Sequence, residues 1–187
     1  MARAIWMECQ ASVDPERLHF CDETSFRTDM TRLRGWCESH CRLVAKVPCK
    51  HWETVTLVHT VNLYGCSAAM VCQGAINNSG FETYCSDFLS PVLQANDTVV
   101  LDNLQSHKTA AAILSIESVG AKVAFLPPYS PDLNPIENLF SKIKQIVRRI
   151  KPRNFDSLLD AIAEAIQAVT PSDIYHAFEH AGYLIDQ

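Results

Sequence analysis

The stretch that most constrains this chain is LPPYSPDLNPIENLFSKIK, residues 126–144, in which four prolines precede a helical pattern. Proline fixes φ near about −65° and keeps the preceding residue out of the α region, so the first three prolines predict a stiff, extended loop. Pro135 differs, because it follows Asn134, a favoured N-cap, and proline is favoured at the first helical position. The pattern therefore predicts a rigid loop that leads into a helix beginning at about residue 135.

Glu137 lies in the first turn of this predicted helix. Apolar residues with helical spacing run beside it: Ile136, Leu139, Phe140, Ile143, Val147 and Ile150. Taken alone, an N-cap followed three residues later by Glu favours a capping box, in which each side chain bonds to the other residue's backbone N–H. The rest of the chain decides whether Glu137 also has a chemical role.

Apolar segments bounded by turn residues alternate with helical patterns along the whole chain. Strands are predicted at 17–23, 54–65, 66–77, 97–103 and 121–126. Helices are predicted at 80–93, 107–118, from about 135 to 150, 155–169, and from 171 to about 182. This order predicts an α/β or α+β domain with a mixed sheet.

Acids occupy three marked places in this pattern. Asp22 would end the first strand, Asp102 would end the buried fourth strand, and Glu137 would open a helix. An acid at a strand end is usually a turn or cap residue. In open α/β sheets, however, the functional crevice lies beyond the carboxyl ends of strands, and carboxylates that meet there repel each other unless a cation lies between them. Mg²⁺ prefers such oxygen ligands, and a pair of ions about 3.5–4 Å apart suits in-line phosphoryl displacement.

The charge distribution is uneven although the net charge is −5. Basic residues form two clusters: Lys142, Lys144, Arg148, Arg149, Lys151 and Arg153, and Arg27, Arg32, Arg34, Arg42, Lys46 and Lys50. Such runs are commonly solvated surfaces, and they also suit contact with nucleic-acid phosphates. No apolar run approaches the roughly 20 residues that span a bilayer, and the N-terminus lacks a signal-peptide core, which predicts a cytoplasmic protein without a membrane partner.

Eight cysteines in a chain without a visible secretion signal predict reduced thiols rather than a disulfide framework. Some of them lie near histidines, and the possible zinc ligands are Cys37, His40, Cys41, Cys49 and His51. The paired spacing of structural zinc sites is only half present in this cluster. The sequence leaves open whether the cluster binds a metal.

Three segments resemble the signature segments of DDE transposases of the mariner-type superfamily, and most of all its bacterial insertion-sequence members: DETSF with RLRGW, VVLDNLQSHK, and the proline-rich stretch. The 34 residues from 103 to 136 match the separation of the last two acids in the branch that ends in Glu. The resemblance covers about residues 17–150 and implies an α/β, ribonuclease-H-like fold, with a mixed sheet flanked by helices and a C-terminal helical tail. It assigns 1–153 to the catalytic domain and 154–187 to a helical extension packed on the same domain.

The same resemblance implies a DNA-processing activity. Asp22, Asp102 and Glu137 would be the catalytic acids and the ligands of two Mg²⁺ ions, for which Mn²⁺ would substitute. Glu23 competes with Asp22 for the first role, but strand alternation directs it to the opposite face. The resemblance and local sequence place four residues in support of the site: Glu23, Asn103, His107 and Asn134. DNA contacts are expected from Arg32, Arg34, Lys142, Lys144, Arg148 and Arg149.

Two functions follow as alternatives. The first is a transposase catalytic domain that cleaves DNA at transposon ends and transfers the strands to target DNA. Because only 21 residues precede Asp22, a helix-turn-helix DNA-binding region would be supplied elsewhere, and the enzyme would work as a homo-oligomer on DNA in the bacterial cytoplasm. The second is a catalytically idle transposase remnant that binds DNA or a transposase. The three acids favour the enzyme, whereas the short N-terminal segment favours the remnant.

Overall fold

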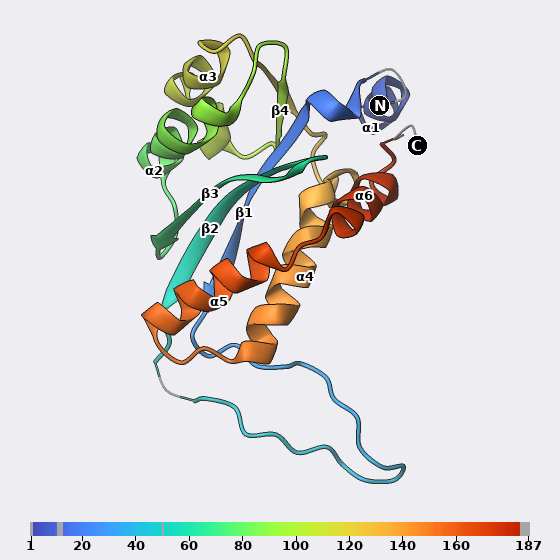
Figure 1. The fold of residues 1–187 in the computed structure, drawn as a ribbon, viewed down its shortest axis with the longest axis vertical. Coiled ribbons are helices and arrows are strands. Elements are labelled where there is room, and N and C mark those ends of the chain that lie inside the picture. Colours follow the sequence, from blue (N-terminus) through green and yellow to red (C-terminus); the bar gives the residue numbers. More distant parts are fainter. Residues whose placement is uncertain (1, 11–12, 50, 184–187) are drawn as a thin grey trace.

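The computed structural model describes residues 2–10, 13–49 and 51–183, and Lys50, of the basic cluster that begins at Arg27, lies outside them. Five strands form one sheet in the order β3-β2-β1-β4-β5 (Figure 1). Their bounds are β1 Leu18–Arg27, β2 Thr54–Asn62, β3 Gly65–Gln73, β4 Thr98–Leu101 and β5 Lys122–Phe125. The first three strands pair antiparallel, whereas β1, β4 and β5 run parallel. The central strand β1 therefore joins an antiparallel half of the sheet to a parallel half.

The expectation that the first strand ends at Asp22 was wrong. β1 continues to Arg27, because its antiparallel pairing with β2 runs from Phe20 to Arg27. The parallel pairing of β1 with β4 stops at Cys21 opposite Leu101. Asp22 is thus the first residue of β1 beyond the parallel ladder, and Asp102 follows β4 directly. The two acids therefore lie on neighbouring strands, at the carboxyl end of their parallel pairing.

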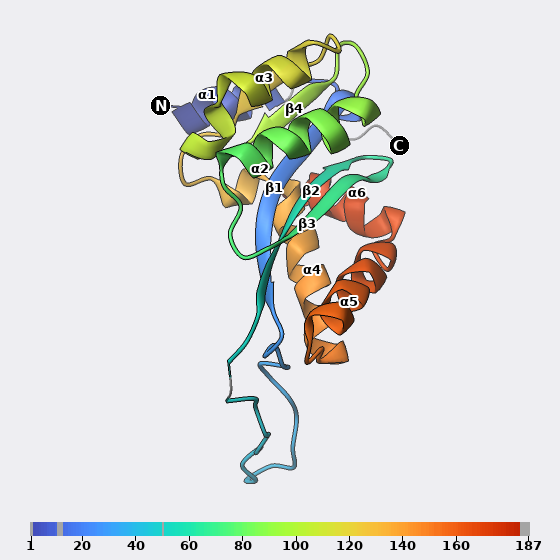
Figure 2. The ribbon, with the colours of Figure 1, turned by 90° about the vertical axis from the view of Figure 1, so that its left-hand side faces the viewer.

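Helices cover both faces of the sheet (Figure 2). On one face lie α4 (Pro135–Ile150), α5 (Phe155–Gln167) and α6 (Pro171–His180). These helices share a core with Leu18, Phe20 and Phe26 of β1. On the other face lie α2 (Asn78–Thr83), which continues as a π-helical turn through Leu89, and α3 (Ala110–Glu117). The expected apolar stripe of α4 is buried against the sheet at Ile136, Leu139, Phe140, Ile143 and Val147.

One helix was not anticipated from the sequence. α1 (Ala2–Gln10) precedes β1, and Gln10 is its one buried residue within the described part of the chain. Within the described residues, no helix combines the length and apolar character needed to cross a membrane.

Residues 28–49 and 51–53, between β1 and β2, form an arm that projects from the body of the domain (Figures 1 and 2). Its base is closed by hydrogen bonds between Thr28 and Glu53, in which the N–H of each residue donates to the other. Arg153, in the α4–α5 connection, donates to the carbonyls of Thr28 and Met30 at 3.1 Å each. The base of the arm is therefore fixed to the helical face, whereas Trp36 is fully exposed farther out.

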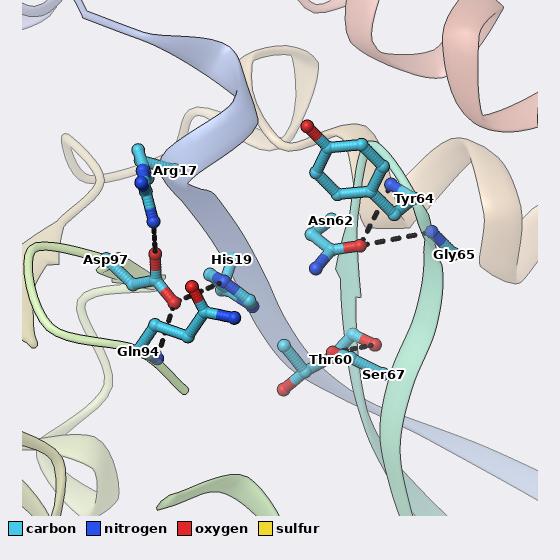
Figure 3. Close-up of polar contacts among 9 residues, drawn as sticks. All are labelled: Arg17, His19, Thr60, Asn62, Tyr64, Gly65, Ser67, Gln94 and Asp97. Atoms are coloured by element: carbon cyan, nitrogen blue, oxygen red, sulfur yellow. Dashed lines mark hydrogen bonds and ion pairs between the residues drawn. The ribbon is translucent and has the colours of Figure 1, made fainter. Parts of the chain in front are cut away.

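Asp97 connects the starts of β1 and β4, at the opposite end of these strands from the acids (Figure 3). Its carboxylate lies 3.1 Å from His19 Nε2, accepts from Arg17 at 3.3 Å, and accepts from the Gln94 N–H at 2.7 Å. On the antiparallel side, the Asn62 side chain closes the β2–β3 turn by accepting from the N–H groups of Tyr64 and Gly65. The contacts of Asp97 thus join the starts of β1 and β4, the two strands that carry Asp22 and lead to Asp102.

Candidate active site

Asp22, Asp102 and Glu137 line one cavity of about 590 Å³. They come from β1, from the residue after β4, and from the first turn of α4. Asp22 is buried, Asp102 is half-buried and Glu137 is exposed. The rest of the wall is formed largely by residues 103–105 and by the proline-rich loop 126–131. The three acids that the sequence singled out thus meet at one place, beyond the carboxyl ends of the parallel strands.

Asp22 is the acid with the most perturbed environment. Burial raises the pKa of its carboxyl to about 7, against the opposing effect of a hydrogen bond from the Glu23 N–H at 2.8 Å. The negative charges of Asp102 and Glu137 raise the pKa further. A carboxyl group in a buried place beside two other acids is costly to ionise, and a cation among them would relieve that cost.

Asn134 supports Asp22 instead of capping α4. Its amide nitrogen donates to Asp22 Oδ2 at 3.0 Å, and it makes no side-chain capping bond to the helix. The capping box with Glu137 that the local sequence favoured was therefore wrong, because a buried partner on β1 takes up the amide. The amide oxygen of Asn134 is buried and has no hydrogen-bond partner in the described part of the chain. Asn134 itself is one of the residues that line the cavity.

His107 connects Asp102 to Glu23. It is fully buried, its Nε2 lies 2.8 Å from Glu23 Oε1, and its Nδ1 forms a 2.6 Å ion pair with Asp102 Oδ1. Burial alone would lower the pKa of His107, but the contacts with the two carboxylates outweigh it and raise the pKa to about 9. His107 is therefore an imidazolium between two acids at neutral pH. Glu23 points to the opposite face from Asp22, as strand alternation predicted, yet His107 connects it to Asp102.

The backbone beyond β4 also restrains Asp102. The Leu104 N–H donates to Asp102 Oδ1 at 3.0 Å. Partial burial would raise the pKa of Asp102, but His107 and this N–H together lower it. Asn103 lies in the cavity wall, where its side-chain oxygen accepts a hydrogen bond from Lys108. Asp102 is thus held in its ionised form, whereas Asp22 is not.

The basic residues of α4 occupy two faces of the helix. Lys144 and Arg148 follow Glu137 at helical spacing, and both line a second cavity of about 490 Å³ beside the arm, at Leu33 and Val47. Burial lowers the pKa of the Lys144 ammonium, while the charges of Glu137 and Asp22 oppose that effect. A positively charged strip therefore leads from the acids toward the base of the arm.

The other basic residues expected to contact DNA lie elsewhere. Lys142 faces α6, where it is ion-paired with Asp173. The exposed Arg149 lies about two helical turns beyond Lys142. Arg32 and Arg34 are exposed on the arm. The structure does not gather all six predicted DNA contacts on one surface.

The possible zinc ligands of the arm do not come together. Cys37 and Cys41 share a turn, in which the Cys37 thiol donates to the Cys41 carbonyl at 3.0 Å, whereas Cys49 and His51 lie near the base. All eight cysteines lie in the described ranges, and none of them forms a disulfide bond there. Within those ranges, no three His, Cys, Asp or Glu side chains are placed close enough to form a ready-made metal cluster, in the arm or in the cavity.

The donor atoms of the cavity nevertheless fit a hard divalent cation. They are carboxylate oxygens and the unpaired amide oxygen of Asn134, the ligand types that Mg²⁺ prefers. Burial, with a further contribution from the negative charges of Asp102 and Glu137, raises the pKa of Asp22.

Comparison with family profiles gives the family of this chain, and comparison with solved structures gives its fold. The profile of a family described as DDE superfamily endonuclease matches residues 17–159. A mariner Mos1 paired-end complex with Mn has a TM-score of 0.79 at 16% identity, over 97% of this chain and 57% of that one. The complex with Mg has a TM-score of 0.75 at 17% identity, over 96% and 58%. The catalytic domain of Mos1 mariner transposase has a TM-score of 0.67 at 14% identity, over 99% and 92%.

The extent of these matches limits what they show. The chain spans a little over half of the transposase chains in the paired-end complexes. At these identities the similarity establishes a shared fold, so the expected ribonuclease-H-like sheet with flanking helices and a helical C-terminal segment is confirmed. No curated protein sequence matched the chain.

Proposed function

Because this chain belongs to the DDE superfamily endonuclease family, we propose that it is the catalytic part of a transposase, which cleaves DNA at transposon ends and transfers the strands to target DNA. One observation carries the proposal: three carboxylates from β1, the end of β4 and the start of α4 line the same cavity. The proposed catalytic residues are accordingly Asp22, Asp102 and Glu137.

These carboxylates would hold two divalent cations, Mg²⁺ or Mn²⁺, together with the amide oxygen of Asn134. The cations would supply charge for activating the attacking oxygen and for stabilising the leaving oxygen of the phosphodiester. Support comes from the donor set of the cavity and from the solved Mos1 paired-end complexes, which are described with Mg and with Mn.

The neighbouring side chains would orient the acids. Asn134 holds one oxygen of Asp22, and His107 with the Leu104 N–H holds Asp102. Because the acids then need little reorganisation, their oxygens are presented in a fixed arrangement, which sites of this kind require. Lys144 and Arg148 would bind backbone phosphates of DNA that leaves the cavity toward the arm.

The partners and setting remain part of the proposal. A helix-turn-helix region supplied elsewhere would recognise the transposon end, and a homo-oligomer would hold paired ends. We also propose the division into a catalytic domain at 1–153 and an extension at 154–187, since α5 and α6 share the core of α4. The sequence resemblance supports a bacterial insertion sequence as the proposed origin of the chain, and the cytoplasmic location stays a prediction from the sequence.

Nicking of supercoiled plasmid by the purified chain tests the proposal. The assay compares Mg²⁺, Mn²⁺ and a chelator, and wild type with Asp102→Ala. Asp160→Ala, which removes an exposed acid of α5, serves as the matched control. We expect metal-dependent nicking by wild type and Asp160→Ala, and loss of at least a hundredfold in Asp102→Ala.

Nicking that survives in Asp102→Ala, or that needs no metal, would contradict the proposed site. A folded wild-type protein that binds DNA without nicking it would instead support the alternative of an idle, DNA-binding remnant.

A further inference from the structure

Helix α1 contacts the rest of the domain through polar residues on one face. Arg3, Trp6 and Gln10 follow each other at helical spacing. Arg3 makes a bidentate ion pair with Asp132 at 2.7 and 2.8 Å, and Gln10 donates to the Ala181 carbonyl at 3.0 Å. The indole N–H of Trp6 lies 3.2 Å from the Tyr183 hydroxyl, to which it donates. α1 is thus connected both to the turn before α4 and to the segment after α6.

Tyr183 is brought back into the core by the end of α6. Gly182 has φ +87°, a left-handed conformation that glycine adopts readily, and the Tyr183 N–H bonds back to the Phe178 carbonyl at 3.0 Å. The Tyr183 ring then packs edge-on to Phe20 of β1, with 5.0 Å between centroids. Burial raises the pKa of the Tyr183 hydroxyl to about 12, so this group remains a hydrogen-bond donor.

The hydroxyl of Tyr183 donates to the buried carbonyl of Leu133 at 3.0 Å. Leu133 ends the 3₁₀ turn Pro131–Leu133, and the next residue is Asn134, which donates a hydrogen bond to Asp22 and directly precedes α4. A directional series of hydrogen bonds therefore runs from Trp6 to Tyr183 and on to Leu133. Through the backbone, this series reaches Asn134, which contacts Asp22 and comes shortly before Glu137 in the chain.

We propose that Tyr183 is a positioning residue for the acid cavity, and that Trp6 orients its hydroxyl for this purpose. Its hydrogen bond fixes the turn 131–134, so that the Asn134 amide meets Asp22 and α4 begins where Glu137 enters the cavity. Arg3 restrains the same turn from its solvent side through Asp132. The catalytic consequence rests on the proposed function, whereas the ordering of the turn does not.

The physical reason is the sensitivity of such sites to small displacements. Loss of the hydroxyl leaves the buried Leu133 carbonyl without its donor, and the turn then moves to find another partner. A shift of about 1 Å at catalytic groups can cost about a hundredfold in rate. A residue that acts only on stability would leave the site geometry of the folded protein unchanged.

Tyr183→Phe tests the proposal, because it removes the hydroxyl and keeps the ring. Tyr84→Phe is the matched control: its hydroxyl is also buried, lies 2.6 Å from the Thr60 hydroxyl and 3.2 Å from the Ala68 carbonyl, and belongs to the other core. Hydrogen exchange of peptides that cover 127–140 reports the order of the turn. Plasmid nicking against Mn²⁺ concentration reports the site.

We expect Tyr183→Phe to speed exchange in 127–140 at least fivefold and to raise the half-saturating Mn²⁺ concentration at least tenfold. Tyr84→Phe should change neither quantity at a temperature where both proteins are folded. Trp6→Phe should shift both in the same direction as Tyr183→Phe by a smaller factor, and should add nothing in the Tyr183→Phe background.

Equal behaviour of the two tyrosine variants would overturn the inference, and so would unchanged exchange in Tyr183→Phe. If Tyr183→Phe does not fold, Trp6→Phe decides by the same two quantities. If wild type fails to nick DNA, the proposed function fails, while the exchange comparison still decides whether Tyr183 orders the turn.

Discussion

Replacement of His59 by glutamine should make the folding stability of this domain less sensitive to mild acid. His59 lies opposite Asp22 in the β1–β2 pairing and is 1% exposed. Burial lowers the pKa of its imidazole to about 4, although its hydrogen bond to the Ala68 carbonyl, at 2.8 Å, acts in the opposite direction. The folded protein therefore keeps His59 neutral over a pH range in which the unfolded chain binds a proton.

The sign and size follow from this difference. Because the folded pKa lies below the unfolded value of about 6.5, the contribution of His59 to stability is complete above pH 6.5 and is lost as the pH falls toward 4. Between about pH 7.5 and 5.0 the loss for this one group is about 2 kcal/mol. Glutamine does not titrate, and its amide can still donate to the Ala68 carbonyl.

Urea unfolding followed by circular dichroism at the two pH values measures the effect. Other groups titrate in the same range, so the relevant quantity is the difference between wild type and variant. His180→Gln, at an exposed position of α6, controls for removal of a histidine as such. The reasoning is refuted if wild type and His59→Gln lose the same free energy of unfolding between these pH values.

Two further predictions concern the cavity and the basic strip. In the absence of metal, Asp22→Asn should raise the free energy of unfolding by on the order of 2 kcal/mol, because it removes a buried acid beside Asp102 and Glu137, and it should abolish nicking. Thermal melts measure the stability and the plasmid assay measures the nicking; a variant less stable than wild type would contradict the prediction. Lys144→Ala should reduce the slope of log affinity for DNA against log salt concentration by about 1, whereas the control Lys122→Ala, at the start of β5, should leave the slope unchanged. Fluorescence anisotropy over a salt series measures both slopes, and equal slopes in the two variants would contradict the role of Lys144.

The parts of the fold that were predictable have local causes. The start of α4 follows from Pro135 at the first helical position, and the buried strand β4 follows from its uninterrupted apolar run. The length of β1 was not predictable in this way, because Arg27 belongs to the strand only through its pairing with β2. The helix α1 escaped for a similar reason, since its contacts join residues more than 120 positions apart.

The site shows the same division between local and long-range causes. The three acids were marked by their places at strand and helix ends, and the structure brings them to one cavity. The role of Asn134 was misjudged, because a tertiary partner on β1 displaced the local capping bond. His107 was singled out by its motif, but its bridge between Glu23 and Asp102 depends on a contact across 84 positions that no local pattern reveals.

Anomalous diffraction from crystals soaked in Mn²⁺ tests most directly whether the three acids form one divalent-cation site. We expect anomalous density within coordination distance of Asp22 and Asp102, with Glu137 completing the ligand set, and its loss in Asp102→Ala crystals. Ordered Mn²⁺ at other residues only, or a cavity that stays without anomalous density at saturating Mn²⁺, would show that the acids form no such site.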